Sequence, residues 1–139
     1  MTIWKQQATL SELNSLSNET LIAHLGIEYT QIGDDFITAK MPVDQRTRQP
    51  FGMLHGGASA VLAETLGSVA ANLAVEEDKI CVGLELNASH LRSVENGFVS
   101  GIAKVVRIGR TVQVWQINIS NEQAQLICSS RLTVSVIDK

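Results

Sequence analysis

Residues Ser59–Glu77, "SAVLAETLGSVAANLAVEE", form an almost unbroken apolar segment with a single carboxylate, Glu64, in its middle. Apolar side chains occur on every side of its helical projection, so the segment predicts one largely buried helix, from about residue 58 to about residue 75. The preceding "QPFGMLHGGA", Gln49–Ala58, places two adjacent glycines where that helix begins. A buried helix must be covered by the rest of the chain, and this requirement decides the fold.

The segments on either side of this helix predict the elements that cover it. Leu10, Leu13 and Leu16 recur at helical spacing, and Gly26 predicts the end of this short helical region. Residues 27–43 predict two strands that turn at residues 33–35, and the chain from residue 80 onward predicts four more. The expected fold class is α+β, with one long central helix wrapped by an antiparallel sheet of about six strands, in a single domain over residues 1–139.

The first of the last four strands shows the alternation expected of a half-buried strand. In "CVGLELNASH", Cys81–His90, the apolar residues Val82, Leu84, Leu86 and Ala88 alternate with smaller or polar ones and are expected to share one face. A single sheet leaves edges and part of a face open, so pairing with a second copy is expected. The sequence predicts at least a homodimer.

Composition and charge exclude several classes of partner. With 45% hydrophobic and 18% charged residues, the chain is typical of a globular domain. Its formal net charge is −3, and no run of lysines and arginines marks a surface for nucleic acid or anionic lipid. The N-terminus lacks an apolar leader region, and the longest apolar segment is interrupted by Glu64 and Asn72. We expect a cytoplasmic protein with no membrane and no nucleic-acid partner.

Cysteines and histidines give no sign of a metal or redox site. Cys81 and Cys128 lie far apart in apolar, strand-like contexts, which indicates two reduced, buried thiols. His24, His55 and His90 have no second ligand at the spacing that a metal requires. The sequence predicts no metal site and no cofactor.

The charge within the apolar helix belongs to a polar stripe. With Glu64 at 0° and about 100° per residue, Ser68 falls near about 40°, Asn72 near about 80° and Thr65 near about 100°. Burying an ionised carboxylate without partners costs several kcal/mol, so this stripe must face polar groups, water or both. A salt bridge or subunit contact and a catalytic role both fit this pattern.

The start of the same helix favours a site. Gly56 and Gly57 lie where the first backbone N–H groups have no partner within the helix, and glycine lets a ligand approach that backbone closely. Such a position suits an oxyanion. Glu64 lies two turns, or about 12 Å, further along the helix axis, too far for one small reacting group to contact both. If a second copy of the chain faced the first, its Glu64 could reach a group bound at Gly56 of the first copy.

Three segments carry a resemblance to a known family. The run "QPFGMLHGGASAVLAETLGS", followed by "NASHLR" and "GRTVQVWQI", resembles the small bacterial hotdog-fold acyl-CoA thioesterases. The resemblance covers nearly the whole chain and is strongest to the subgroup of 4-hydroxybenzoyl-CoA and 1,4-dihydroxy-2-naphthoyl-CoA hydrolases. The hotdog fold alone would not imply this activity, because it also occurs in dehydratases and acyl-binding regulators.

The resemblance implies roles for individual residues. Glu64 would be the catalytic carboxylate, acting as nucleophile on the thioester carbonyl or as general base toward water. The N–H of Gly56 would polarise that carbonyl, and Gln49 would help to hold the thioester or the attacking water. Ser68 would orient water or the acyl group. In the family, Gln49 and Gly56 come from one subunit and the carboxylate from its partner.

Other polar residues near these motifs have two interpretations. His55 is expected close to the thioester, but it would also serve as a turn residue that caps the helix. His90 and Arg92 match family positions near the acyl group and the CoA moiety, although a solvated strand end explains them equally well. For Arg107 and Arg110, a solvated turn is favoured over contact with CoA phosphates.

These observations predict a thioester hydrolase acting on an aromatic acyl-CoA such as 1,4-dihydroxy-2-naphthoyl-CoA, in menaquinone biosynthesis. Its oligomer would be a dimer or a homotetramer built as a dimer of dimers. One alternative is a proofreading thioesterase that acts on acyl groups of an acyl carrier protein, because pocket shape decides between such substrates. A non-catalytic acyl-CoA-binding module is a second. A hydroxyacyl dehydratase, which would need His55 paired with a carboxylate across the interface, ranks well below the thioesterase.

Overall fold

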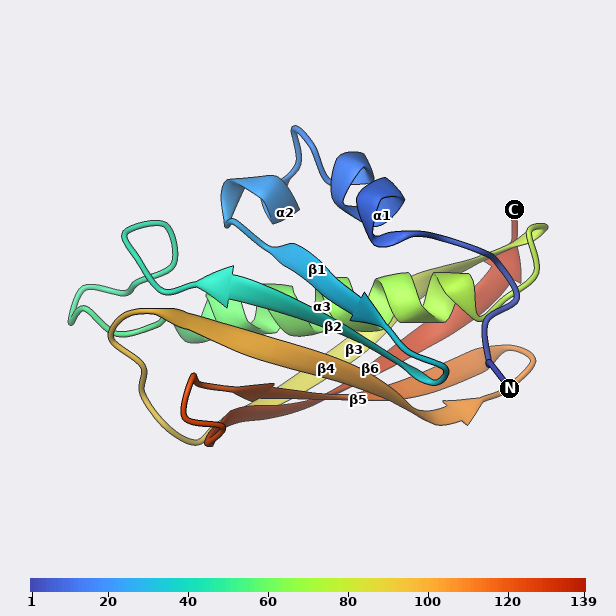
Figure 1. Ribbon diagram of the computed structural model, residues 1–139. Coiled ribbons are helices and arrows are strands. Elements are labelled where there is room, and N and C mark those ends of the chain that lie inside the picture. The colour runs from blue at the N-terminus through green and yellow to red at the C-terminus, as the bar shows by residue number, and fades with distance from the viewer.

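The computed structural model describes residues 1–139 and contains one sheet and one long helix (Figure 1). The elements are α1 (Leu10–Leu16), α2 (Leu21–His24), β1 (Glu28–Ile32), β2 (Phe36–Pro42), α3 (Gly56–Leu73), β3 (Lys79–His90), β4 (Phe98–Ile108), β5 (Val112–Ser120) and β6 (Leu126–Asp138). All strand pairs are antiparallel, in the order β1-β2-β4-β5-β6-β3. The predicted α+β architecture is confirmed.

The core lies between α3 and the face of the sheet that curves around it. Leu62 and Leu66 of α3 are fully buried, as are Ile117 and Ile119 of β5. Helix and sheet approach closely, because a side chain added at Gly67 would meet the Cδ2 of a β6 leucine at 2.6 Å. Small residues on α3 therefore let the helix sit deep in the curve of the sheet.

The N-terminal segment closes one end of this core. The Trp4 ring stacks on Trp115 of β5 with 6.1 Å between ring centroids, and the Trp4 Nε1–H donates to the Gly33 carbonyl at 2.7 Å. The backbone N–H groups of Lys5 and Gln6 both donate to the last carbonyl of α3. Trp115 is fully buried, so its ring is part of the core.

The expected alternation of β3 is wrong in its first half. Val82 and Leu84 are 42% and 61% exposed, whereas Cys81 is buried. The cause is a β-bulge: the pairing with β6 shifts between Gly83 and Glu85, and Leu84 has no partner. An extra residue in one strand reverses which residues face the core. Before the bulge, Cys81 and Gly83 face the helix.

The two edges of the sheet are covered to different extents. On β1, the Asn14 side chain of α1 accepts from the Tyr29 N–H at 2.8 Å and donates to its carbonyl at 3.2 Å. On β3, Asn72 of α3 does the same for Cys81, at 2.9 and 3.3 Å. Beyond Cys81, no strand or helix pairs with the outer edge of β3. This long edge is open to a further strand.

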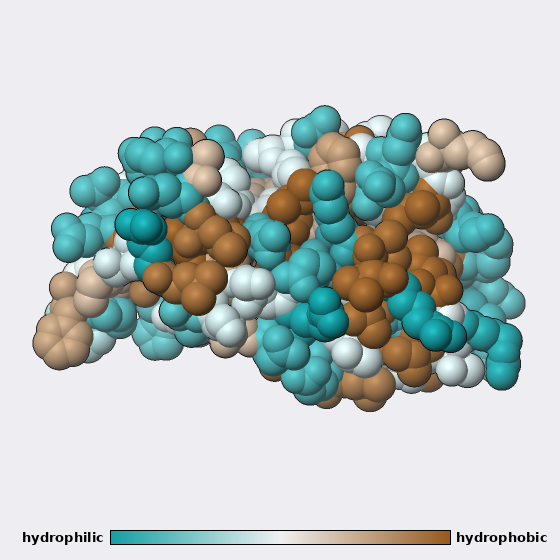
Figure 2. Space-filling view, turned by 90° about the horizontal axis from the view of Figure 1, so that it is seen from below, coloured by the Kyte–Doolittle hydropathy of each residue, from teal (hydrophilic) through white to brown (hydrophobic).

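None of the helices combines the length and the apolar character that a membrane-spanning helix needs. Seen from below, the surface shows separate hydrophobic areas between hydrophilic side chains (Figure 2). Several apolar side chains near one end of the sheet contribute to the exposed apolar surface; they are Ile80, Val82, Val112 and Ile137. The helix therefore covers only one face of the sheet.

Truncating the centre of the helix–sheet contact should destabilise the fold. Leu66→Ala removes a fully buried side chain, so the free energy of unfolding should fall by about 2–5 kcal/mol in urea titrations. Leu16→Ala is the matched control, because Leu16 of α1 is 78% exposed and its truncation should change stability by less than about 0.5 kcal/mol. Equal effects of both substitutions would contradict this description of the core.

Candidate functional site

His55 caps the helix that carries the predicted site. Its Nδ1 accepts a hydrogen bond from the Gly57 N–H at 2.7 Å. The capping role considered for this residue is therefore present. An imidazole that accepts at Nδ1 holds its proton at Nε2 when neutral, so the exposed side of the ring offers an N–H donor.

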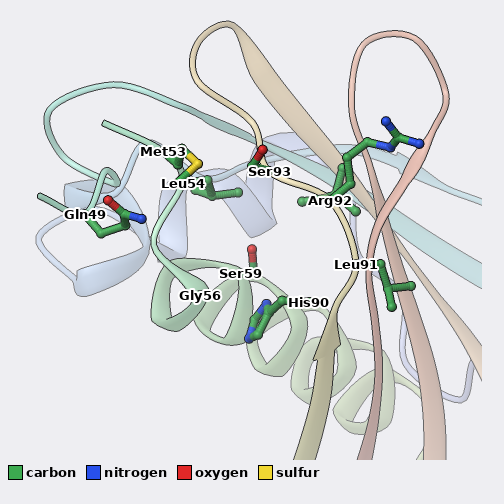
Figure 3. Close-up of a pocket in the computed structure, with 10 residues that line it drawn as sticks. Gln49, Met53, Leu54, Gly56, Ser59, His90, Leu91, Arg92 and Ser93 are labelled. Carbon is green, nitrogen blue, oxygen red and sulfur yellow. The ribbon is translucent and has the colours of Figure 1, made fainter. Parts of the chain in front are cut away.

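Gly56, the first residue of α3, lies in a pocket of about 440 Å³ (Figure 3). Ten residues line it, among them Gln49, Gly56, His90 and Arg92. A side chain at Gly56 would come within 2.9 Å of the His90 Nε2. A larger residue here would therefore displace the imidazole that packs against Gly56. The structure brings four of the predicted site residues to one end of the molecule.

The loop before α3 holds Gln49 in a fixed place. The Gln49 N–H donates to the Met53 carbonyl at 2.8 Å, and the Gly52 N–H donates back to the Gln49 carbonyl at 2.9 Å. Gly52 has a φ of 86°, a conformation that favours glycine. The Gln49 Oε1 accepts from the Phe51 N–H, which leaves the NH₂ group of the side chain to face a ligand.

Arg92 stands apart from the other pocket residues. Figure 3 shows its side chain extending away from Gly56 and His90. The guanidinium is exposed at the rim of the pocket. Arg107 and Arg110 lie next to the β4–β5 turn, at the opposite end of β4 from this pocket. Of these three arginines, only Arg92 lines the pocket.

Glu64 lies in a second groove, two turns along α3 from Gly56. This groove has a volume of about 390 Å³ and is lined by Ile22, Tyr29, Glu64, Thr65, Ser68, Val69 and Asn72. The predicted polar stripe therefore borders an open groove. The Glu64 side chain is exposed, and one carboxylate oxygen is 2.9 Å from where a Cβ on Gly83 would stand.

Glu64 takes no part in an ion pair. The salt bridges of the chain join Lys5 to Glu76, Lys40 to Glu28, Arg46 to Asp44 and Lys79 to Asp138. The structural interpretation of Glu64 as one half of a salt bridge within the chain is therefore not supported. Its carboxylate is available to a ligand or to a second copy of the chain.

Two features of this region were not predicted from the sequence. Asn72 belongs to the polar stripe, but its amide holds the start of β3, with its Oδ1 accepting from Cys81 at 2.9 Å. Gly83 lies beneath the Glu64 carboxylate. A glycine inside a strand often marks a β-bulge or the close approach of another group. Gly83 within the predicted strand was therefore the signal from which the sequence could have indicated this contact.

The cysteines lie outside both grooves. Cys81 and Cys128 are buried and unpaired, and burial raises the pKa of each thiol. A buried thiol with a raised pKa is a poor nucleophile. No group of three His, Cys, Asp or Glu side chains is arranged to hold a metal ion. The polar groups that border the grooves are amide, carboxylate, imidazole, guanidinium and hydroxyl groups.

Comparisons of the sequence and of the structure with known proteins indicate the same family. Residues 51–128 match the model of the thioesterase superfamily. The chain is 53% identical to the proofreading thioesterase EntH of Cronobacter turicensis, over 97% of this chain and 98% of that protein. Its structure superposes with a TM-score of 0.97 on thioesterase HI1161 of Haemophilus influenzae, at 52% identity, covering 99% of this chain and 96% of the other.

A second solved thioesterase structure is similar to this chain over its whole length. A mutant of thioesterase PA1618 from Pseudomonas aeruginosa has a TM-score of 0.97 and 44% identity, covering 99% of this chain and all of that one. The long helix wrapped by a six-stranded antiparallel sheet is the hotdog fold expected from the sequence. By fold and by sequence over nearly its whole length, the chain belongs to the thioesterase superfamily.

Proposed function

We propose that the chain hydrolyses acyl thioesters at a site shared between two of its copies, with Glu64 as the catalytic carboxylate. One observation supports this above all. The Gly56 amide and the Glu64 carboxylate border separate grooves of one chain, so neither groove brings the proposed oxyanion donor and the proposed carboxylate together. A second copy that brought its Glu64 to the first copy's Gly56 would complete the site.

The open edge of β3 supplies the means of pairing. With a two-fold axis at Asn87, antiparallel pairing sets Leu86 of one copy against Ala88 of the other, both on the face turned toward α3. Because of the bulge, Gly83 then comes opposite His90 of the other copy. Glu64 lies over Gly83, and Gly56 lies against His90. The pairing would therefore carry each carboxylate to the other copy's helix N-terminus.

Such a site has the groups that thioester hydrolysis needs. The thioester oxygen would accept from the Gly56 N–H, where the positive end of the helix dipole favours developing negative charge. Glu64 as general base would take a proton from water as the hydroxyl adds to the carbonyl carbon. The tetrahedral intermediate then collapses, and the thiolate leaves and takes up that proton. As nucleophile, Glu64 would form an anhydride that water hydrolyses.

Neighbouring side chains would position the reacting atoms. Gln49, with its free NH₂ group, lines the same pocket as Gly56, and His55 offers its Nε2–H as a further donor at the start of the helix, outside the lining of that pocket. His90 would limit the space around the thioester, since its ring packs against Gly56. Ser68, one turn after Glu64, borders the same groove and would orient water or the acyl group.

For the substrate, we propose an aromatic acyl-CoA such as 1,4-dihydroxy-2-naphthoyl-CoA, as in menaquinone biosynthesis. The groove at Glu64 supports a ring with polar substituents, because it has apolar walls at Ile22 and Val69 and hydroxyls at Thr65 and Ser68. Arg92 at the pocket rim would bind a phosphate.

The likeness to EntH favours a second candidate, proofreading of acyl groups on a carrier protein. A dehydratase, which would pair His55 with a carboxylate across the interface, is disfavoured because the His55 Nδ1 already accepts a hydrogen bond from the Gly57 N–H.

The test of the proposal is Glu64→Gln. We expect turnover to fall by at least about 1,000-fold with an aryl-CoA ester and with an aryl-loaded carrier protein alike, because both substrates would use one base. The melting temperature should stay within about 2 °C of wild type, because the exposed carboxylate makes no ion pair. Near-normal turnover of the folded variant would contradict the proposed chemistry. Whichever substrate gives the higher kcat/KM in the wild type identifies the natural acyl donor class.

Two variants distinguish the capping role of His55 from its proposed role as an N–H donor in the site. His55→Asn keeps a side-chain acceptor for the N-cap, whereas His55→Ala loses it and should be less stable by about 1 kcal/mol. Both lose the Nε2–H donor, so both should show a similar loss of kcat/KM. Full activity in His55→Asn, with a loss only in His55→Ala, would limit His55 to capping. Thermal melts measured beside the assay distinguish these results.

A further inference from the structure

We propose that Gly83 is a positioning residue for thioester hydrolysis, because the absence of its side chain provides the space that the Glu64 carboxylate occupies. The inference rests on the proposed function of Glu64 and adds a residue of β3 to the site.

The evidence is a contact that only glycine allows. A Cβ on Gly83 would stand 2.9 Å from the Glu64 Oε2, and the next atoms, the Glu64 Cδ and a Leu132 methyl, are at 3.8 and 3.9 Å. Ordinary contact starts at 3.4 Å, so the carboxylate would have to move by at least about 0.5 Å. Every other neighbour would stay in place.

The backbone itself does not require glycine at this position. The glycines with positive φ are Gly26, Gly52 and Gly97, and Gly83 is not among them. Alanine is therefore compatible with the conformation of the strand. Glycine weakens a strand interior, so its presence here is explained by the carboxylate above it rather than by the chain path.

The β-bulge and Gly83 act together. After the bulge, Leu86 and Ala88 face the helix, and regular alternation would place Leu84 on that face as well. The register shift between Gly83 and Glu85 turns Leu84 outward, where it is 61% exposed, and presents Gly83 to α3 instead. The bulge thus replaces a leucine with a glycine beneath Glu64. Bulges beside active sites commonly redirect side chains in this way.

The displacement should affect catalysis far more than stability. The Glu64 carboxylate is the exposed end of a flexible side chain, so it can move aside at little cost to the fold. Catalytic groups, however, must stay within about 0.5 Å of their productive position. We expect Gly83→Ala to lower kcat by about tenfold to a hundredfold while KM and the melting temperature change little.

A double-mutant cycle tests whether Gly83 acts through Glu64. Glu64→Asp withdraws the carboxylate by one methylene and so relieves the overlap with a new Cβ. The cost of Glu64→Asp in kcat should therefore be smaller in the Gly83→Ala background than in the wild type. Val82→Ala is the matched control, because this neighbour faces away from α3 and its truncation should leave kcat unchanged.

Each result has a distinct meaning. Wild-type kcat in Gly83→Ala, strict additivity in the cycle, or a fall in kcat that follows a fall in melting temperature or loss of the dimer would overturn the inference. High activity of Glu64→Gln would instead overturn the proposed function on which it rests. A kcat loss without a stability loss, together with coupling to Glu64→Asp, supports Gly83 as a positioning residue.

Discussion

The close packing of α3 into the curved sheet is the constraint on which the rest of the structure depends. Side chains of Leu132 and Leu66 lie within 2.7 Å of where Cβ atoms on Gly67 and Gly101 would stand, so helix and sheet leave no room for larger residues. An 18-residue helix held this way has a fixed rotation about its axis. Only one stripe of it stays uncovered, and Glu64 lies in that stripe.

The same packing divides the polar groups between two places. The start of α3 emerges at one end of the sheet, where Gly56 shares a pocket with Gln49 and His90. Glu64 emerges two turns later, beside the open edge of β3. Gly56 makes room for the His90 imidazole and Gly83 makes room for the Glu64 carboxylate. Each chain thus offers two half-sites, and a second copy at the open edge would join them.

Much of this was predictable from the sequence, because it depends on patterns within single elements. The apolar segment specified the buried helix, alternation specified the strands, and helical geometry specified the stripe that contains Glu64 and Ser68. The bulge was not predictable, because the sequence around Leu84 continues the alternation that the structure breaks. The contact of Trp4 with Trp115 joins segments far apart in the chain, and the hydrogen bond between Asn72 and Cys81 depends on how α3 packs beside β3.

The central claim, that two copies share each site, is tested most directly by mixing subunits. Gln49→Ala and Glu64→Ala variants, each nearly inactive alone, are allowed to exchange subunits, and differently tagged chains are used to count the mixed dimers. If opposite copies supply the two residues, each mixed dimer has one doubly altered site and one intact site. About half of the dimers are then mixed, so activity should return to about a quarter of the wild-type value. Mixed dimers that form but recover no activity would contradict the shared site.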